Sequence, residues 1–331
     1  MPVDDRIPEA PGHGAAQSES SGDSSDSLLP LQRRARLYER TWGIAVGPVL
    51  LRRAAIVLAR KASRKPGHRA HGEGEVIARD PRRWVEAGPR DRGSFMMFLD
   101  PHSAGHGANQ MALGTYDETL MAALRTHSLE SGVIWDVGAH IGYESLCFAT
   151  VVGPAGRIVA FEPNPANVRE WQRNVSGNAE LAPRLSIQAV ALCDRSGTAA
   201  FRFSEDVADG RSSGSHLAGV MPPEEAASYA GFDLANVACA RVDDLVEAGD
   251  IAPPTLIKID VEGAEADVLR GAIRTLQRHR PILLVEVHHV RAMHDVDEIL
   301  RDAEYATTLL DSPEDSASRC FLEGVPAEPR G

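Results

Sequence analysis

The sequence has few cysteines and few aromatic residues, and it lacks several common signatures. Its four cysteines, Cys147, Cys193, Cys239 and Cys320, include no CxxC pair. This pattern argues against a structural zinc site and favours free thiols in a reducing compartment over disulfides. No run of about 20 uninterrupted apolar residues is present, and the first residues lack the apolar core of a signal peptide. We therefore expect a cytoplasmic protein without a transmembrane helix.

Positive charge is scarce except in one segment. Lys and Arg number 35 against 47 Asp and Glu, which gives a net charge of −12. Residues 32–70 nevertheless hold 11 Lys and Arg against Glu39 alone. Because the whole chain carries −12 and this segment +10, the remainder carries −22. An acidic body of this kind is not built to coat nucleic acid, so we expect no nucleic-acid partner.

The composition divides the chain into three parts. Residues 1–30 are rich in Ser, Asp and Glu and are predicted to be a disordered acidic tail. Residues 31–75 are predicted to be a basic helical arm and a linker. The segment 31–70 could lie on an anionic membrane surface, although packing on the domain or disorder is favoured. Residues 76–331 form the main domain.

Five apolar runs in that domain predict strands at 133–137, 157–163, 185–192, 255–260 and 281–287. Segments that can form helices follow three of them, at 142–152, 164–177 and 262–279. The runs lack polar alternation, as strands covered on both faces do. The pattern predicts an α/β fold with a doubly wound, mostly parallel sheet. The stretch 193–254 is too long for a simple crossover and is predicted to be an insert.

The first run leads into an unusual turn, VIWDVGAHIG at 133–142. Gly138 and Gly142 allow close approach to the backbone, but the third glycine of a dinucleotide site is missing. Asp136 would repel a pyrophosphate and attract a cation, such as an amino group or a sulfonium. Glu162 ends the next strand, where an acid can accept the hydroxyls of a ribose. The pattern favours S-adenosylmethionine over NAD, and NAD-dependent oxidoreduction remains the alternative enzyme class.

An ordered set of motifs extends this interpretation. The set is GTYDETL (114–120), DVGAHIG (136–142), FEPNPANV (161–168), IKIDVEGAE (257–265), VLRGA (268–272) and PILLVEVHH (281–289). Together, over roughly residues 95–290, these motifs resemble the FkbM family of S-adenosylmethionine-dependent methyltransferases. The resemblance implies a class I methyltransferase fold of the Rossmann-like type. It also implies O-methylation, often of sugar or natural-product hydroxyls.

The resemblance also implies roles for individual residues. The methionine end of the cofactor would be lined by Asp136, Gly138, Ala139 and Gly142. Glu162 would hold the ribose, and backbone groups near Val190 would contact the adenine. The domain would then comprise a cofactor half at about 130–192, the insert at 193–254 and an acceptor side at 255–331.

Candidates for the catalytic groups follow the fourth and fifth predicted strands. They are Asp260, Glu262, His288, Lys258 and Glu286. Asp260 or Glu262 could hold or deprotonate the acceptor hydroxyl, and His288 is a candidate base because its ordinary pKa is near neutral. Lys258 could pair with an acid such as Glu286, in a structural or a catalytic role.

Mg²⁺ is a second mechanistic option, because Asp260 and Glu286 end adjacent strands. Two acids are a thin ligand set, so we expect transfer without a metal. The predicted function is S-adenosylmethionine-dependent O-methylation of a small-molecule hydroxyl acceptor, sugar-containing or a secondary metabolite. A non-catalytic module that contacts a membrane through its basic arm is a further alternative.

Overall fold

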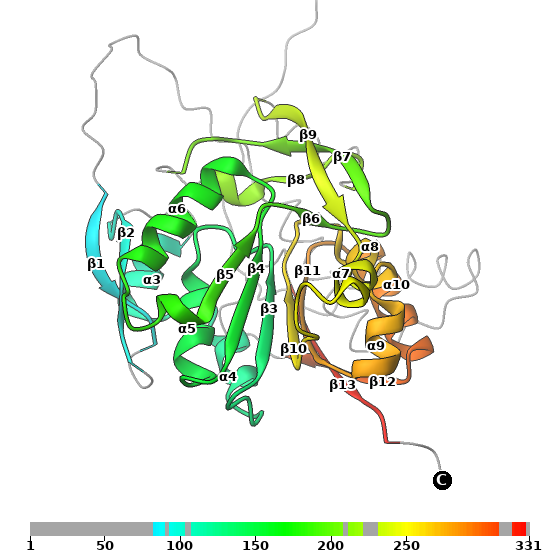
Figure 1. Ribbon diagram of the computed structural model, residues 1–331. Coiled ribbons are helices and arrows are strands. Elements are labelled where there is room, and N and C mark those ends of the chain that lie inside the picture. Colours follow the sequence, from blue (N-terminus) through cyan, green and yellow to red (C-terminus); the bar gives the residue numbers. More distant parts are fainter. Residues whose placement is uncertain are drawn as a thin grey trace, which may run out of the picture. The chain divides into compact units, whose positions relative to one another are not determined.

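The five apolar runs of the sequence supply five strands of one seven-stranded sheet in the computed structural model (Figure 1). The structure describes residues 82–89, 93–102, 107–207, 211–220, 231–310 and 320–328, which all belong to one structural unit. The predictions for the tail, 1–30, and for the basic arm and linker, 31–75, lie outside the described residues.

The strands of this sheet do not follow the order of the chain. Their spatial order is β12-β13-β11-β10-β3-β4-β5. Their bounds are β3 (Val133–Val137), β4 (Arg157–Phe161), β5 (Leu185–Gln188), β10 (Leu256–Ile259), β11 (Ile282–Val287), β12 (Tyr305–Leu310) and β13 (Cys320–Pro326). The pairs from β11 to β5 are parallel, whereas β13 is antiparallel to both β11 and β12. The doubly wound, mostly parallel sheet predicted from the sequence is confirmed.

Helices cover both faces of the sheet and create two cores (Figure 1). One face carries α4 (Glu118–Leu124), α5 (Tyr143–Val151) and α6 (Pro165–Ser176), and the other carries α7 (Val242–Ala248), α8 (Glu265–Arg270), α9 (Ile273–His279) and α10 (Val290–Asp302). Adjacent residues of β3 enter different cores: Ile134 packs in the first with Leu146, and Trp135 in the second with Val296. Both faces of the central strands are therefore apolar, which explains the missing alternation.

A hairpin precedes the sheet. It consists of β1 (Arg83–Ala87) and β2 (Phe95–Leu99), and α3 (Ala108–Leu113) follows it. The side chain of Asn174 on α6 accepts a hydrogen bond of 2.8 Å from the N–H of Phe98. Asn178 does the same, also at 2.8 Å, for the N–H of Met96. These asparagines cap the free edge of β2 and fix the hairpin against α6.

Two predicted segments are divided in the structure. The predicted strand 185–192 splits into β5 and a short β6 (Ala191–Leu192), which belongs to a second sheet. The predicted helix 262–279 splits into α8 and α9. At Gly271, between these helices, an added Cβ would lie 2.2 Å from the carbonyl oxygen of Cys193. The break between β5 and β6 and the break between α8 and α9 are therefore close in space, because the chain that leaves β6 at Cys193 contacts Gly271.

Apart from β6, the second sheet lies in the stretch predicted as an insert, 193–254. Its order is β6-β9-β7-β8, with β7 (Gly197–Phe203), β8 (His216–Leu217) and β9 (Asp233–Ala240). A short 3₁₀ turn, η3 (Arg211–Gly214), precedes β8, and another, η2 (Ala182–Arg184), precedes β5. In Figure 1 this sheet lies above the ends of β4 and β5. The insert is thus an ordered sheet in its described residues and covers one edge of the large sheet.

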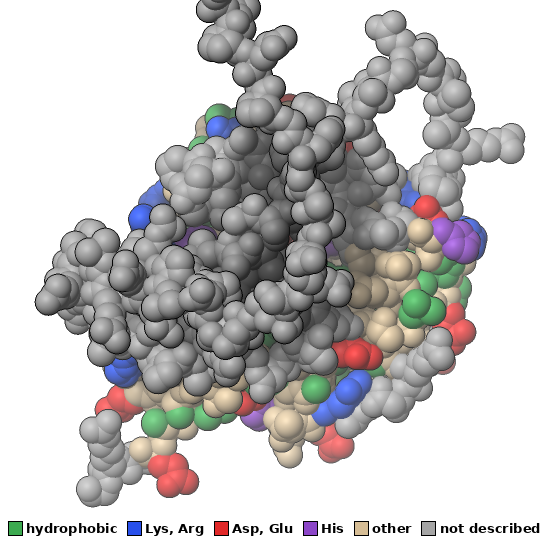
Figure 2. Space-filling model, turned by 180° about the vertical axis from the view of Figure 1, so that it is seen from behind, with side chains coloured by type: hydrophobic (Ala, Val, Ile, Leu, Met, Phe, Trp, Pro, Cys, Tyr) green, Lys and Arg blue, Asp and Glu red, His purple; other side chains and the backbone are tan. Residues whose placement is uncertain are grey.

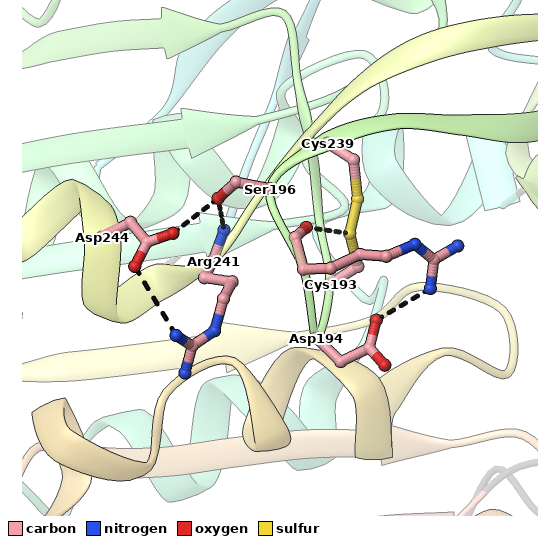
Figure 3. The surroundings of a disulfide bond; sticks show 7 residues. Cys193, Asp194, Ser196, Cys239, Arg241 and Asp244 are labelled. Carbon is pink, nitrogen blue, oxygen red and sulfur yellow. Dashed lines mark hydrogen bonds and ion pairs between the residues drawn. A yellow bond between two sulfur atoms is a disulfide. The ribbon is translucent and has the colours of Figure 1, made fainter.

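The prediction of free thiols is wrong for Cys193 and Cys239, which form a disulfide with their Cα atoms 6.3 Å apart (Figure 3). The pairing of β6 with β9 sets Cys239 opposite Ala191, beside Cys193. The two cysteines are 46 residues apart, so no local motif announces the bond. Cys147 remains a buried free thiol. The cysteine pattern consequently no longer supports a reducing compartment.

None of the helices among the described residues combines the length and the apolar character that a membrane crossing requires. On the face shown in Figure 2, acidic and basic side chains of the described residues lie interspersed and are not gathered by sign.

The turn between β3 and α5 depends on glycine. Gly138, with φ of 81°, and Gly142, with φ of 91°, both adopt the left-handed conformation. A Cβ at Gly138 would lie 1.7 Å from the carbonyl oxygen of Asp260, and one at Gly142 would lie 2.8 Å from the ring of Trp171. Glycine is thus required at both positions, because the backbone is left-handed there and because a side chain would overlap neighbouring atoms. At Gly138 the neighbouring atom belongs to the chain that follows β10.

We predict that Gly138→Ala destabilises the fold by about 3 kcal/mol or more, because the new methyl group would overlap a backbone atom that cannot move aside cheaply. Gly153→Ala is the matched control, since Gly153 also has positive φ, 69°, but no atom within 4 Å of its added Cβ. It should cost only about 1 to 2 kcal/mol of backbone strain. Urea unfolding of both variants tests this, and equal losses would contradict a steric role for Gly138.

Candidate active site

The carboxyl ends of β3 and β10 and the start of α5 bring three carboxylates to one buried lysine. The Nζ atom of Lys258 lies 2.5 Å from Glu144 Oε2, 3.4 Å from Asp136 Oδ1 and 3.7 Å from Asp260 Oδ2. It also donates a hydrogen bond of 3.2 Å to the carbonyl of Gly138. Burial alone would lower the pKa of Lys258, but Glu144 and Asp136 raise it well above its ordinary value. Lys258 therefore stays charged.

Two oxygens of this cluster remain without a hydrogen bond although they are buried. They are Oδ1 of Asp136 and Oε1 of Glu144. The other oxygen of Asp136 accepts a hydrogen bond of 2.5 Å from Ser145 Oγ. Burial raises the pKa of Glu144, and the charge of Lys258 opposes that rise. One cation thus faces several carboxylates, and the site is suited to attract a further positive group beside the glycine turn.

Glu162 follows β4 and is held by the same turn. Its Oε2 accepts a hydrogen bond of 3.0 Å from the N–H of His140, and its Oε1 accepts one of 2.8 Å from the N–H of Asn164. Asn167 Nδ2 donates to the same Oε1 at 3.3 Å. Burial raises the pKa of Glu162 to about 7, although these donors favour the charged form. The carboxyl is therefore rigidly placed, and Oε2 keeps one lone pair for a ligand.

The turn itself is tied to β4. The N–H groups of Gly138 and Ala139 both donate to the carbonyl of Phe161, at 3.0 and 3.1 Å. The N–H of Glu162 donates in turn to the carbonyl of Gln188, at 3.1 Å, and the N–H of Val190 reaches that same carbonyl at 2.9 Å. Val190 therefore lies next to the Glu162 turn, at the end of β5.

A second cluster surrounds His288, just after β11. Its Nδ1 lies 2.7 Å from Glu265 Oε1. Its Nε2 faces three further carboxylate oxygens, at 3.4 Å (Asp260), 3.5 Å (Glu286) and 3.6 Å (Glu262). Burial alone would lower the pKa of His288, but Glu262 and Glu265 raise it well above its ordinary value. Asp260, Glu286 and His288 could also hold a metal ion, since they offer three ligand atoms within 4.8 Å of one another.

The segment that carries these residues matches a known protein family. The chain matches the methyltransferase FkbM domain over residues 136–306, which is more than half of its length. The chain belongs to the FkbM methyltransferase family. The match begins at Asp136, includes both carboxylate clusters and confirms the resemblance seen in the sequence.

Two curated relatives of this FkbM chain are themselves methyltransferases. Hexuronic acid methyltransferase AglP of Haloferax volcanii is 29% identical over 194 residues, which are 58% of this chain and 71% of that protein. 2-O-methyltransferase NoeI of Sinorhizobium fredii is 29% identical over 153 residues, covering 45% of this chain and 60% of that protein. A solved structure, methyltransferase FkbM from Methylobacillus flagellatus, is 20% identical with a TM-score of 0.42, and the alignment covers 58% of this chain and 43% of that one.

The FkbM domain gathers the predicted site residues at one edge of the sheet. The predicted cofactor residues Asp136, Gly138, Ala139, Gly142 and Glu162 surround the ends of β3 and β4, and Val190 lies beside them. The predicted catalytic residues Lys258, Asp260, Glu262, Glu286 and His288 lie at the ends of β10 and β11. The individual roles of these residues remain predictions.

Two details differ from the sequence-based expectation. Lys258 forms its ion pairs with Asp136, Glu144 and Asp260, whereas Glu286 faces His288. His288 was predicted to act as a base because its ordinary pKa is near neutral. In the structure, neighbouring carboxylates raise the pKa of His288. An imidazolium cannot accept a proton, so within this cluster the carboxylates of Asp260 and Glu262 are the better bases.

The sequence did not single out Glu144, Ser145 or Glu265. A signal for the first two was present, because the helix YESLCFATV is apolar apart from its first turn and Thr150. Two polar residues at the start of a buried helix, directly after the glycine turn, point toward the site. Glu265 stands within the motif IKIDVEGAE, but only the fold shows that α8 sets it against His288.

A segment of the insert is hydrogen-bonded to the glycine turn and to α6. The side chain of Asn164 donates to the carbonyl of Ser204 at 2.9 Å, and that of Asn167 donates to the carbonyl of Ser212 at 3.3 Å. The Nε2 atom of His140 lies 3.1 Å from Ser212 Oγ. The insert therefore forms one wall beside Glu162.

We predict that Lys258→Met destabilises the protein by about 3 to 5 kcal/mol at neutral pH, because it leaves buried carboxylates without their cation. The double variant Lys258→Met/Glu144→Gln should recover part of that loss, since it removes one of the stranded charges. Thermal or urea unfolding measures both effects.

Arg270→Met is the matched control for this prediction. Arg270 also contacts two acids, Asp267 and Asp295, each at 2.8 Å, but 45% of its side chain is exposed. An exposed pair contributes about 1 kcal/mol at most. A Lys258→Met variant that loses no more stability than Arg270→Met would show that Lys258 is not the charge on which the cluster depends.

Glu162 leads to a prediction on pH dependence. Its pKa in the folded chain, about 7, exceeds the ordinary value of 4.5, so the folded state binds more protons in between. Its favourable contribution is present below the unfolded pKa and is lost as the pH rises through about 7. Relative to Glu162→Gln, the native chain should lose about 2 to 3 kcal/mol of unfolding free energy between about pH 5 and about pH 8. A difference that stays constant with pH, or grows in the other direction, would refute this.

Proposed function

We propose that this chain is an S-adenosylmethionine-dependent O-methyltransferase that acts on a hydroxyl of a sugar-containing or secondary-metabolite acceptor. One observation carries the proposal: an FkbM domain in which Asp136, Glu144 and Glu162 converge on a glycine turn at the carboxyl ends of parallel strands. Ligands of open α/β sheets bind at such ends. The family match favours methyl transfer over NAD-dependent oxidoreduction.

The residues beside the turn fit the methionine end of this cofactor. Its sulfonium and its amino group are cationic, and the buried oxygens Asp136 Oδ1 and Glu144 Oε1 have no hydrogen bond of their own. A positive group placed there would satisfy atoms that are otherwise costly to bury. Gly138 and Gly142 keep side-chain volume away from the turn.

The residues after β4 and β5 fit a nucleoside. Glu162 has a spare lone pair on Oε2 and can accept a ribose hydroxyl, while His140 and Asn164 hold its carboxylate in place. Backbone groups around Val190, next to this turn, would contact the adenine. The wall formed by Ser212 and its neighbours would limit the access of water on that side.

The chemistry divides between the cofactor and the chain. When bound, S-adenosylmethionine supplies a methyl group already activated by a sulfonium. Transfer forms a carbon–oxygen bond, breaks a carbon–sulfur bond and releases the hydroxyl proton. The chain must align the hydroxyl and accept that proton. Asp260 and Glu262, which are 21% and 24% exposed, can do both from the end of β10.

The names of the relatives support the class of acceptor. AglP is described as a hexuronic acid methyltransferase and NoeI as a 2-O-methyltransferase. A small hydroxylated acceptor of this kind is also consistent with the acidic rim formed by Asp260 and Glu262, because carboxylates accept hydrogen bonds from sugar hydroxyls.

We predict that the purified chain binds S-adenosylmethionine and that Glu162→Gln lowers the affinity at least about tenfold, through loss of a charged acceptor. Isothermal titration calorimetry measures this. Glu170→Gln is the matched control, because Glu170 is a buried acid on α6 that pairs with Arg82 and Arg173 away from the strand ends. The affinity of the Glu170→Gln variant for S-adenosylmethionine should equal that of the native chain.

Absence of binding by the native chain at millimolar S-adenosylmethionine would overturn the proposed cofactor. The acceptor class has its own test, the transfer of a radiolabelled methyl group to a panel of hexuronic acids, neutral sugars, glycosylated metabolites and small amines. Labelling of amines but not of hydroxyls would overturn O-methylation.

A further inference from the structure

The cluster around His288 has the composition and spacing of a metal site. Asp260, Glu286 and His288 each present one ligand atom, and these atoms lie within 4.8 Å of one another. His288 Nε2 is 3.4 Å from Asp260 Oδ1 and 3.5 Å from Glu286 Oε1, too far for strong hydrogen bonds. Two atoms that bind one transition-metal ion at about 2.1 Å lie about 3.0 to 4.2 Å apart. The two separations from His288 Nε2 fall in that range.

A separate observation comes from the opposite side of the imidazole. Glu265 is fully buried, and its Oε1 lies 2.7 Å from His288 Nδ1. The partner oxygen, Oε2, is buried without a hydrogen bond. A histidine that binds a metal characteristically donates its other ring N–H to a carboxylate, which fixes the ring and turns the free nitrogen to the ion. Glu265 gives His288 that orientation, with Nε2 directed at the carboxylates.

We propose that Asp260, Glu286 and His288 form a binding site for a divalent transition-metal ion, represented by Mn²⁺, with Glu262 at its rim. The ion would take the place of the proton on His288 Nε2, because only the unprotonated nitrogen binds a metal. A nitrogen ligand beside carboxylates suits manganese and zinc better than Mg²⁺, which prefers oxygen and water alone. The two-acid Mg²⁺ site considered from the sequence thus becomes a three-ligand site once the fold adds His288.

The position of the site suggests its use, a step that rests on the proposed function. Asp260 reaches His288 with Oδ1 and Lys258 with Oδ2, and its carbonyl lies against Gly138 in the glycine turn. An ion at the His288 cluster would therefore lie next to the methionine end of the cofactor site. There it would orient the acceptor hydroxyl and lower its pKa, so that Glu262 can take the proton.

Electron paramagnetic resonance of Mn²⁺ tests the site without cofactor or acceptor, because the signal of the free ion disappears on binding. The native chain should bind Mn²⁺ saturably with one ion per chain, and His288→Gln should lower the affinity at least tenfold. Glu265→Gln should lower it about tenfold through loss of the orienting carboxylate. His127→Gln is the control, because His127 also contacts a carboxylate, Glu323 at 2.8 Å, but lies outside the cluster. The affinity of the His127→Gln variant for Mn²⁺ should equal that of the native chain.

Asp260→Asn keeps the test decisive if His288→Gln fails to fold, because Asp260 is partly exposed. No binding by the native chain at millimolar Mn²⁺ would overturn the site. Binding that neither His288→Gln nor Asp260→Asn weakens would overturn it as well. Since the measurement contains no S-adenosylmethionine, its failure is distinct from a failure of the proposed function. Methyl transfer that survives complete removal of the metal by a chelator would overturn the role at the acceptor.

Discussion

The buried ammonium of Lys258 is the interaction on which this edge of the sheet depends. It lies between carboxylates from β3, α5 and the end of β10 and also binds the carbonyl of Gly138. Acids at the ends of adjacent parallel strands repel one another, and burial strengthens the repulsion. One central cation allows three of them to coexist. It does not neutralise them, and the residual negative charge beside the glycine turn is what a cationic methyl donor would need.

The glycine turn couples this electrostatic arrangement to the backbone. Gly138 brings β3 so close to β10 that the carbonyl of Asp260 occupies the space of a Cβ. The same turn donates the N–H of His140 to Glu162 and those of Gly138 and Ala139 to Phe161. Thus one five-residue connection sets the relative positions of the acids after β3, β4 and β10. Preorganisation of this kind matters because a site built for alignment tolerates little displacement.

The fold was predictable from the sequence wherever hydrophobic pattern determines the outcome. Apolar runs separated by helical segments leave few alternatives to a doubly wound sheet, and acids at strand ends must then meet at one edge. The hydrophobic pattern could not show which acidic side chain forms an ion pair with which basic side chain. Lys258 pairs with Glu144 because β10 lies beside β3 and Glu144 stands in the first turn of α5, just after the turn that follows β3. The two residues are more than a hundred positions apart in the sequence. The disulfide of Cys193 and Cys239 escaped prediction for the same reason, since it follows from the pairing of β6 with β9.

The two carboxylate clusters share Asp260, and this sharing has a consequence for binding. A positive group at the His288 cluster would draw Asp260 away from Lys258, which would leave Lys258 to Asp136 and Glu144 and reduce the negative charge on the cofactor side. A positive group at the cofactor side would have the reverse effect. Because both proposed sites would compete for one carboxylate, their occupancies would be thermodynamically linked, and linkage is reciprocal. The edge of the sheet would then act as one charged unit, with the two proposed sites coupled through the end of β10.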